Sequence, residues 1–479
     1  MKSTYKSLIF LILIFSSYSF NTRASSLSLE EIIDLGLNVL VIDTENNEEP
    51  SCEYVSHPEG SMGMSITNAT KVPGSIKIYS PAGEILYYSG AYEKGESGMT
   101  IKIRGNTSAY YDKKPYKIKL QKKSDLLLRG DKKYYDKNWV LLNDYSLKVA
   151  MGFEVSRLIK MDWTPAGEYV NVILNGDYKG YYYLVESVER NQNARIDVSE
   201  DGFIIEHDPY WWNENGEYLD SEFSPSYNYT FKYPDYEDIS IDQLNRIQNE
   251  IEIYESSLKN DTFEDYVDLE SLAKWFLGHD ILGTWDGGGA NFYLYKFAVP
   301  SPSLIKFGPL WDFDSILKME NKWSGPHNQS RFATFFKSID TPFMKNYISI
   351  WKNQGKEIKK GLEEYILYIR EGKQWQGVVK SSEATAPIWG DTLNLNEISD
   401  MYEDWFNNRF EWLSQQLGEF NDEISDESGV NSIYDYDKDI LKDVYNLQGI
   451  KILSKASTQE IKNLPPGIYF INHQKFVIK

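Results

Sequence analysis

The chain has 479 residues, of which 41% are hydrophobic and 15% are aromatic, so it carries ample material for a core. Asp and Glu number 71 against 50 Lys and Arg, and the net charge is −21. This balance argues against nucleic acid as a partner, because phosphate backbones require a basic face. It is compatible with a basic protein substrate. The length suits two or three domains, or one bilobed domain with accessory segments.

The N-terminus has the features of a secretory signal peptide. Two lysines precede an apolar run at residues 8–15, which is too short to span a bilayer, and Ala24 offers a small residue at the cleavage site. We expect residues 1–24 to be a signal peptide and the mature chain to be exported to the cell surface or the extracellular space. An N-terminal membrane anchor is the alternative. No later stretch predicts a transmembrane helix, and the single Cys52 cannot form an internal disulfide.

Residues 74–120 predict a β-rich segment. Residues 76–88 contain two strand-like runs around a Pro-Ala-Gly turn, which is a hairpin signal, and residues 99–103 alternate strictly between apolar and polar. The alternating run leads into residues 104–108, where Gly105 permits a tight turn whose amides could meet a phosphate.

The next predicted strand, residues 113–120, is rich in lysine. Lys117 and Lys119 share one face of it, opposite two apolar side chains. One of these lysines could neutralise nucleotide phosphates. The alternative is a solvated strand face without a ligand.

The remainder of the main region passes from strands to helices. A second hairpin is predicted at residues 169–186, and residues 203–208 form a further strand with an acidic end. From Asp242 onward the pattern is helical, and Asp268 caps a helix whose apolar residues recur at helical spacing. That helix leads directly to Asp286. The order predicts an α+β fold with a β-rich N-terminal half and a helical C-terminal half, with a ligand at their junction.

Two short motifs carry the chemistry. Asp286 and Asn291 are five positions apart, as are the aspartate that accepts the substrate hydroxyl proton and the asparagine that holds a second Mg²⁺ in a kinase catalytic loop. Further on, Trp311-Asp312-Phe313-Asp314 stands where a kinase keeps its metal-binding Asp-Phe-Gly. A hydroxyl that attacks a nucleotide phosphate needs both a base and a metal-held phosphate. For either motif alone, chance spacing or a turn over a core Trp is the alternative.

The C-terminal part reads as a separate piece. Residues 419–439 are acidic and rich in Ser, Asn and Gly, which predicts a linker. Residues 440–479 contain short alternating strands separated by Gly and Pro turns. Their Tyr-Asn-x-x-Gly, Pro-x-Gly-Ile-Tyr and Lys-x-x-x-Lys motifs resemble the C-terminal sorting domain of the type IX secretion system, which implies that secretion machinery as a partner. A small β-module that docks on the main domain is the alternative.

Five motifs of the main region, taken in order, resemble the CotH family of atypical kinases, named for spore coat protein H. The motifs are residues 104–108 with 114–119, 139–143, 180–186, 286–296 and 311–314. The resemblance is collinear over roughly residues 35–418 and implies a domain at residues 30–418. It implies a divergent, bilobed protein-kinase-like fold that uses ATP and Mg²⁺ or Mn²⁺. The expected activity is phosphorylation of Ser or Thr on exported or coat proteins.

The resemblance also implies roles for individual side chains. Asp286 would orient and deprotonate the acceptor hydroxyl as the catalytic residue. The remaining candidates bind nucleotide or metal: Arg104, Lys119 and Asn291 for the nucleotide, and Asp312, Asn291 and Asp314 for the metal. We expect Arg104, Lys119, Asp286, Asn291 and Asp312 to converge at the junction of the two halves.

One segment departs from the family pattern. Leu147 stands where family members carry an Asp, and Gly152-Phe153 replaces an Arg-Asn pair. A catalytically degenerate cell-surface binding protein with the same fold is therefore an alternative function, which the many Tyr and Trp residues would suit. A second alternative is a different metal-dependent transferase or hydrolase that uses Asp312 and Asp314 as a carboxylate pair. Binding of Mg²⁺–ATP separates the first alternative from the kinase, and product analysis separates the second.

Overall fold

The computed structural model describes residues 27–421 except for short gaps, together with parts of the last 40 residues. The gaps are 60, 62–63, 67–69, 193, 214–217, 224–225 and 391, and the later described residues are 442–446, 451–456, 461, 464, 467–471 and 474–478. The chain divides into two units, Met1–Phe420 and Asn421–Lys479. The predicted signal peptide and nearly all of the predicted linker lie outside the described residues. Of the helices in the described part of the chain, none has the length and apolar character needed to cross a membrane.

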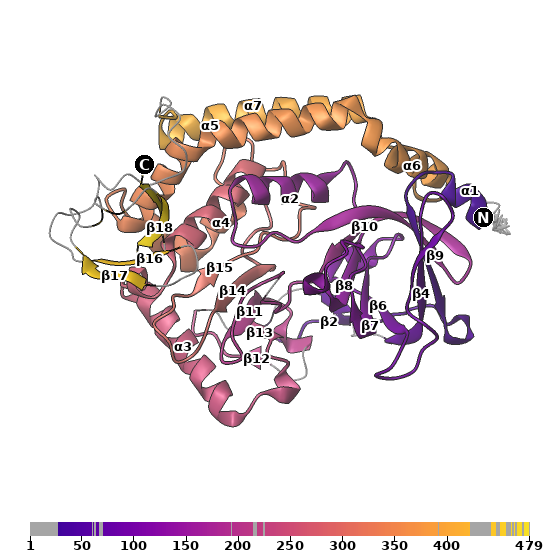
Figure 1. Ribbon diagram of the computed structural model, residues 1–479, viewed down its shortest axis with the longest axis horizontal. Helices are drawn as coiled ribbons and strands as arrows, with labels where there is room; N and C mark the ends of the chain where they lie inside the picture. Colours follow the sequence, from indigo (N-terminus) through magenta and orange to yellow (C-terminus); the bar gives the residue numbers. More distant parts are fainter. Residues whose placement is uncertain are drawn as a thin grey trace, which may run out of the picture. The chain divides into compact units, whose positions relative to one another are not determined.

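A β-barrel occupies the N-terminal half of the first unit (Figure 1). In the described residues its sheet has the order β1-β9-β10-β8-β7-β6-β4-β5, and β1 also pairs with β4, which closes the sheet on itself and leaves β5 as an edge. The pairing of β1 with β9 is parallel, and the other pairings are antiparallel. The strands are β1 (Asn38–Thr44), β4 (Val72–Tyr79), β5 (Ile85–Tyr88), β6 (Met99–Ile103), β7 (Tyr116–Ser124), β8 (Asp136–Leu142), β9 (Gly167–Leu174) and β10 (Asp177–Glu186). The short strands β2 (Tyr54–Ser56) and β3 (Met64–Ile66) pair separately.

The barrel interior is filled by alternate residues of each strand. Ile101 pairs with Ile118, and Ile118 pairs with Trp139, so a row of apolar side chains crosses three neighbouring strands. All three side chains are at most 1% exposed. Burial of each stabilises the fold by roughly 1.5–3 kcal/mol relative to exposure. The period-two pattern places these residues on the inner face and leaves polar residues outside.

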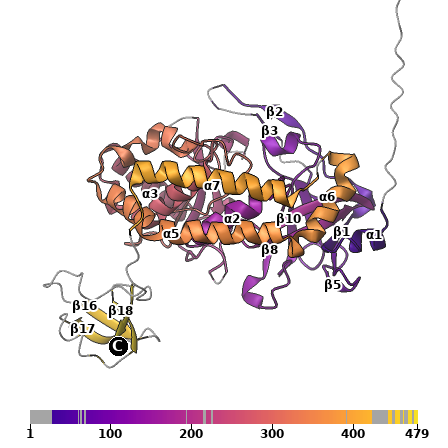
Figure 2. The same ribbon diagram turned by 90° about the horizontal axis from the view of Figure 1, so that it is seen from above.

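A second sheet and six longer helices complete the first unit. The sheet has the order β12-β13-β11-β14-β15. Its strands are β11 (Phe203–Asp208), β12 (Tyr218–Leu219), β13 (Asn228–Tyr233), β14 (Phe292–Lys296) and β15 (Lys306–Phe307). The described helices are α1 (Leu29–Ile33), α2 (Lys148–Leu158), α3 (Ile241–Lys259), α4 (Leu269–Leu282), α5 (Pro342–Glu371), α6 (Gln376–Trp389) and α7 (Leu395–Leu417). Figure 2 shows α5 and α7 side by side, and both pack against α4.

The helix α4 is the element that delivers the first chemical motif. The carboxylate of Asp268 accepts a hydrogen bond from the Ser271 amide at 2.8 Å, which confirms the predicted N-cap. The helix ends at Gly283, which adopts the left-handed conformation (φ 56°) that glycine tolerates best. The predicted α+β class, with a β-rich N-terminal half and a helical C-terminal half, is confirmed. The bilobed, kinase-like arrangement stays a prediction.

The second unit contains a small antiparallel sheet. Its described strands have the order β17-β16-β18-β19, with bounds β16 (Lys442–Asn446), β17 (Lys451–Ala456), β18 (Gly467–Ile471) and β19 (Gln474–Ile478). Val444 on the inner strand β16 is fully buried. The role of this unit as a sorting domain, and the predicted domain boundaries, stay predictions.

Candidate active site

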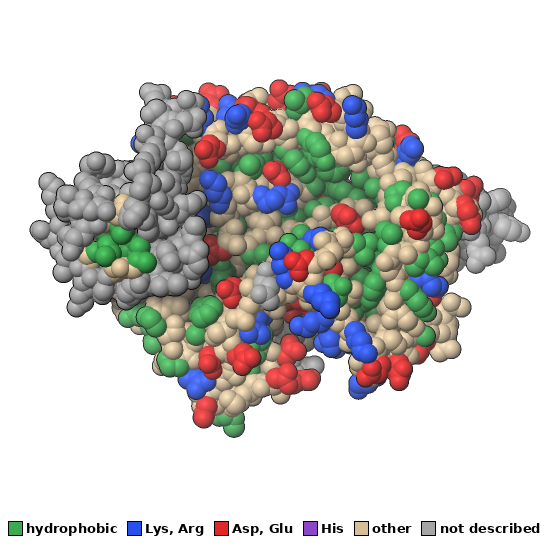
Figure 3. Space-filling view, viewed as in Figure 1, with side chains coloured by type: hydrophobic (Ala, Val, Ile, Leu, Met, Phe, Trp, Pro, Cys, Tyr) green, Lys and Arg blue, Asp and Glu red, His purple; other side chains and the backbone are tan. Residues whose placement is uncertain are grey.

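A cavity of about 910 Å³ lies in the first unit between the barrel and the second sheet. This volume is near the upper end of the range of about 300–1,000 Å³ that is usual for ligand sites. The walls come from the turn after β6, the start of α2, the ends of β10 and β11, the loop before β14 and the residues around 311–314. In the space-filling view, Lys and Arg side chains gather where the two sheets meet (Figure 3). The basic residues that line the cavity include Arg104, Lys113, Lys117 and Lys148, although the whole chain carries a net charge of −21.

The two chemical motifs are tied to each other at the cavity. The Trp285 amide donates to the Ser315 carbonyl at 3.1 Å, and the Asp286 amide donates to the Ser315 hydroxyl at 3.0 Å. The side-chain Nδ2 of Asn291 donates to Oδ2 of Asp312 at 2.9 Å. Both residues have positive φ angles, 59° and 64°, which non-glycine residues adopt rarely and often at functional sites. The chain therefore brings Asp286, Asn291 and Asp312 together, as expected.

The carboxylates of this cluster influence one another. Solvent reaches Asp312 through the cavity, yet protein atoms surround it. This burial and the nearby charges of Asp314 and Asp286 raise the pKa of Asp312 to about 7, although Arg104 and the hydrogen bond from Asn291 act in the opposite direction. The pKa of Asp286 is also raised, by burial and then by Asp314. Crowded carboxylates of this kind favour the binding of a cation.

The donor set fits a metal that arrives with a nucleotide. Within the described ranges, no three His, Cys, Asp or Glu side chains are grouped so that they could hold a metal alone. Mg²⁺ is usually held by one or two carboxylates together with phosphate oxygens and waters, and it prefers oxygen ligands. Asp312, Asn291 and Asp314 all line the cavity and supply oxygen donors. The residues present therefore fit Mg²⁺–nucleotide better than a permanently resident metal.

Of the two predicted phosphate-binding cations, only Arg104 is placed to act. Arg104 lines the cavity and is close enough to Asp312 to lower its pKa. Lys119 is exposed on β7 and lies outside the cavity wall, so the structure does not bring it together with the other predicted residues. Lys117, two residues earlier on the same strand face, lines the cavity and forms an ion pair with Glu189 at 3.4 Å. The alternation along the strand correctly predicted the face that carries Lys117 and Lys119, but only the beginning of β7 lines the cavity.

Two further lysines at the cavity were not singled out from the sequence. Lys113 is 2% exposed, and its ammonium lies 4.0 Å from the centroid of the Tyr181 ring and 5.1 Å from that of Tyr182. Such cation–π contacts stabilise a lysine in a site with little water. Lys148, at the start of α2, donates to the Asp314 carbonyl at 3.0 Å. Both side chains line the cavity and add positive charge to it.

The segment that departs from the family pattern packs against the second motif. A Cβ atom on Gly152 would lie only 2.2 Å from the ring of Phe313, so the absence of a side chain makes room for that ring. Phe153 meets the same ring edge-on, with 5.0 Å between centroids. Leu147 is buried, and the acidic group near it is Asp144, whose Oδ2 accepts from the Val149 amide at 3.1 Å. At Gly152 and Phe153, α2 therefore contacts the ring of Phe313 through apolar packing, in addition to the hydrogen bond from Lys148 to Asp314.

Glu206, a buried acid on β11, was also not singled out from the sequence. Oε1 of Glu206 accepts from the Asn291 amide at 3.0 Å, and Oε2 forms an ion pair with Lys232 at 2.8 Å. Glu206 is 8% exposed and lines the cavity. The sequence did offer one signal for Glu206, namely an acidic residue inside an apolar strand. A buried charge requires a partner, so such a residue is a candidate for a specific contact.

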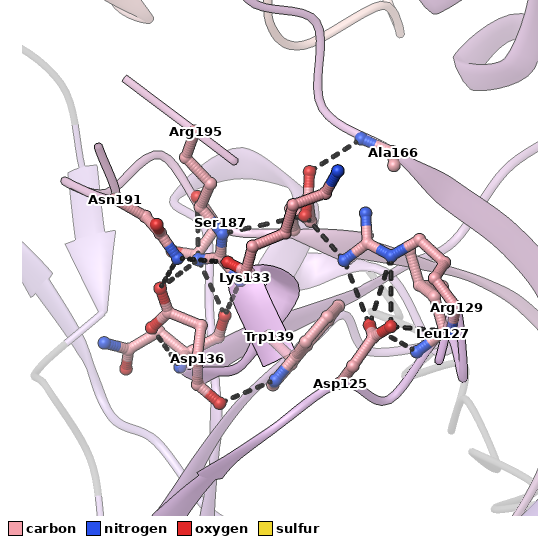
Figure 4. Close-up of polar contacts among 12 residues, drawn as sticks. Asp125, Leu127, Arg129, Lys133, Asp136, Trp139, Ala166, Ser187, Asn191 and Arg195 are labelled. Carbon is pink, nitrogen blue, oxygen red and sulfur yellow. Dashed lines mark hydrogen bonds and ion pairs between the residues drawn. The ribbon is translucent and has the colours of Figure 1, made fainter. Parts of the chain in front are cut away.

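The end of β10, which forms another part of the wall, is held by a network of buried charges (Figure 4). Arg195 is fully buried at its side chain, donates to the Ser187 and Asn138 carbonyls at 3.2 Å, and pairs with Asp136 at 3.7 Å. The neighbouring Glu186 accepts from Arg129 at 2.8 Å. Because each charge has partners, the backbone at residues 186–189 is fixed beside the cavity.

Comparison with known proteins assigns the chain to a family. The family described as CotH kinase protein matches residues 101–413, which is more than half of the chain. The matched range includes Arg104, Asp286, Asn291 and Asp312. No curated protein matches the chain. The extent of the family match shows that this chain belongs to the CotH kinase family.

Proposed function

We propose that this protein is an exported kinase that transfers the γ-phosphate of ATP to Ser or Thr hydroxyls of secreted or surface proteins and depends on Mg²⁺ or Mn²⁺. The observation that carries the proposal is the meeting of Asp286, Asn291 and Asp312 in one cavity of a CotH-family chain. Export rests on the signal-like residues 1–24 and on the sorting-like residues 440–479, which would engage the secretion machinery.

The chemistry assigned to this site is a direct transfer. The acceptor oxygen bonds to the γ-phosphorus, the bond from that phosphorus to the β–γ bridging oxygen breaks, and ADP leaves. Asp286 takes the proton of the acceptor hydroxyl, and its raised pKa suits a base that must hold this proton. Arg104, Lys113 and Lys117 offset the phosphate charge from the barrel side. Bound Mg²⁺ would neutralise charge on the phosphates, with Asp312 and Asn291 as its protein ligands.

The test compares two conservative variants of the mature protein. Asp286→Asn removes the base and should slow phosphate incorporation by about 10²–10⁴ while Mg²⁺-dependent nucleotide affinity is largely kept. Asp312→Asn removes a metal ligand and should weaken that affinity as well. Labelled ATP with candidate acceptor proteins measures the first quantity, and calorimetric titration with Mg²⁺–ADP measures the second.

Asp177→Asn is a suitable control, because this side chain is 70% exposed in the hairpin between β9 and β10 and lies outside the cavity wall. It should behave like the wild type in both assays. Equal activity in the wild type and in both site variants would refute the kinase assignment and leave a binding protein. Unchanged nucleotide affinity in Asp312→Asn would move the metal ligand to another residue, with Asp314 the next candidate.

A further inference from the structure

A line of polar contacts runs from the second sheet to the proposed metal ligand. Lys232 on β13 pairs with Oε2 of Glu206 on β11 at 2.8 Å, and Oε1 of Glu206 accepts from the Asn291 amide at 3.0 Å. The side chain of Asn291 then donates to Asp312 at 2.9 Å. Four residues from four separate segments are thus connected, and the line ends at the carboxylate that faces the cavity.

The conformation of Asn291 explains why this support is needed. Its φ of 59° turns the chain from the glycine-rich loop into β14, and this left-handed conformation costs free energy in a non-glycine residue. The backbone N–H then has no strand partner and is bonded to Glu206. Since Nδ2 is engaged by Asp312, the amide oxygen is the group of Asn291 that remains as a ligand.

The sheet holds Glu206 at this place. In the antiparallel pairing of β11 with β14, Glu206 lies opposite Tyr293, two residues beyond Asn291. The flanking pairs, Ile205 with Leu294 and His207 with Phe292, are fully or almost fully buried, so a shift of register would expose apolar side chains. The carboxylate of Glu206 is thereby fixed within reach of the Asn291 amide.

We propose that Glu206 is a positioning residue that acts through Asn291 and sets the affinity for the metal–nucleotide complex. This inference rests on the proposed function, because it assigns Glu206 to the metal end of that site. Glu206 reaches the site by a hydrogen bond to the backbone of a ligand, and Lys232 balances its charge. Supporting residues of this kind typically change metal affinity by about 10–100-fold when they are replaced.

A second ion pair in the same sheet provides a matched control. Lys296, at the far end of β14, pairs with Glu250 of α3 at 2.6 Å, and both side chains are largely buried. Neither residue lines the cavity. Loss of the Glu250 pair therefore reports what a broken buried ion pair does to the sheet alone.

The experiment measures Mn²⁺ binding by electron paramagnetic resonance in the presence of a non-hydrolysable ATP analogue, with the metal-free affinity for the same analogue as a second readout. Glu206→Asp keeps the charge but withdraws the acceptor from the Asn291 amide, so Mn²⁺ affinity should fall by about 10–100-fold. Glu206→Gln keeps an acceptor at full reach and should retain most of the affinity. Glu250→Asp and Glu250→Gln should both bind Mn²⁺ like the wild type.

Equal losses in Glu206→Asp and Glu250→Asp, or wild-type Mn²⁺ affinity in Glu206→Asp, would overturn the inference while leaving the proposed function intact. A loss in Glu206→Gln as large as that in Glu206→Asp would also overturn it, because the hydrogen bond would then not be the cause. A wild-type protein that binds no Mn²⁺ with the nucleotide analogue would instead refute the proposed function itself.

Discussion

Gly152 in the middle of α2 controls where the ring of Phe313 lies, and Gly152→Ala should therefore reduce activity. The added Cβ would stand 2.2 Å from two ring carbons, whereas carbon atoms in contact need about 3.5–4.0 Å, so the ring must retreat by about 1.5 Å. Asp312 and Asp314 flank that ring. Since a misplacement of about 1 Å can cost about 10²-fold in rate, we expect phosphate transfer to fall by about 10².

The stability change in this variant should be small. Overpacking costs about 1–3 kcal/mol, and alanine is better than glycine inside a helix by about 1 kcal/mol, so the net loss is about 0–2 kcal/mol. Denaturant unfolding measures this loss, and labelled ATP measures transfer. Gly361→Ala is the control. Its added Cβ would lie 2.3 Å from the side chain of Leu158, and neither residue lines the cavity. Phe313→Leu should restore part of the rate lost in Gly152→Ala. A stabilised Gly152→Ala variant with wild-type transfer would refute the reasoning.

Two further predictions concern pH and the C-terminal unit. Burial raises the pKa of Asp144 from 3.8 to about 6, so the folded state binds its proton more tightly, and stability should fall by about 3 kcal/mol as pH rises from about 4 to 6. Asp144→Asn should flatten that part of the pH profile in urea unfolding, and an unchanged slope would contradict the assignment. Deletion of residues 440–479 should block delivery to the cell surface and leave nucleotide affinity unchanged. Normal delivery of the truncated chain, or its unfolding, would disprove the sorting role.

The strands of the barrel could be predicted from the sequence, but its closure could not. Alternation and turn residues are local signals, and they identified segments such as residues 99–103 and the hairpin at 169–186. Closure depends on β1, which pairs Leu40 with both Ile78 and Val172. Pairings over such separations leave no local pattern. The predicted kinase-like arrangement did not include a closed barrel.

The candidate site shows the same division. The spacing of Asp286, Asn291 and Asp312 was informative because short motifs carry their own geometry. Lys119 lies away from the cavity because strand periodicity determines the face of a side chain and not its distance from the end of the strand. Glu206 was missed because it lies 85 residues before the amide that it binds. Only the register between β11 and β14 brings the two together.

The closed barrel gives one wall of the cavity a fixed shape. Each of the strands β6, β7 and β8 is hydrogen-bonded to a neighbouring strand on both sides. None of them can bend outward without breaking those hydrogen bonds. The turn that follows β6 holds Gly105 at a φ of 87°, in the left-handed region that favours glycine. There a side chain would strike the Ser108 hydroxyl at 2.2 Å. Glycine at position 105 therefore lets the turn pack closely against Ser108 at the edge of this wall, where any side chain would force the turn to widen.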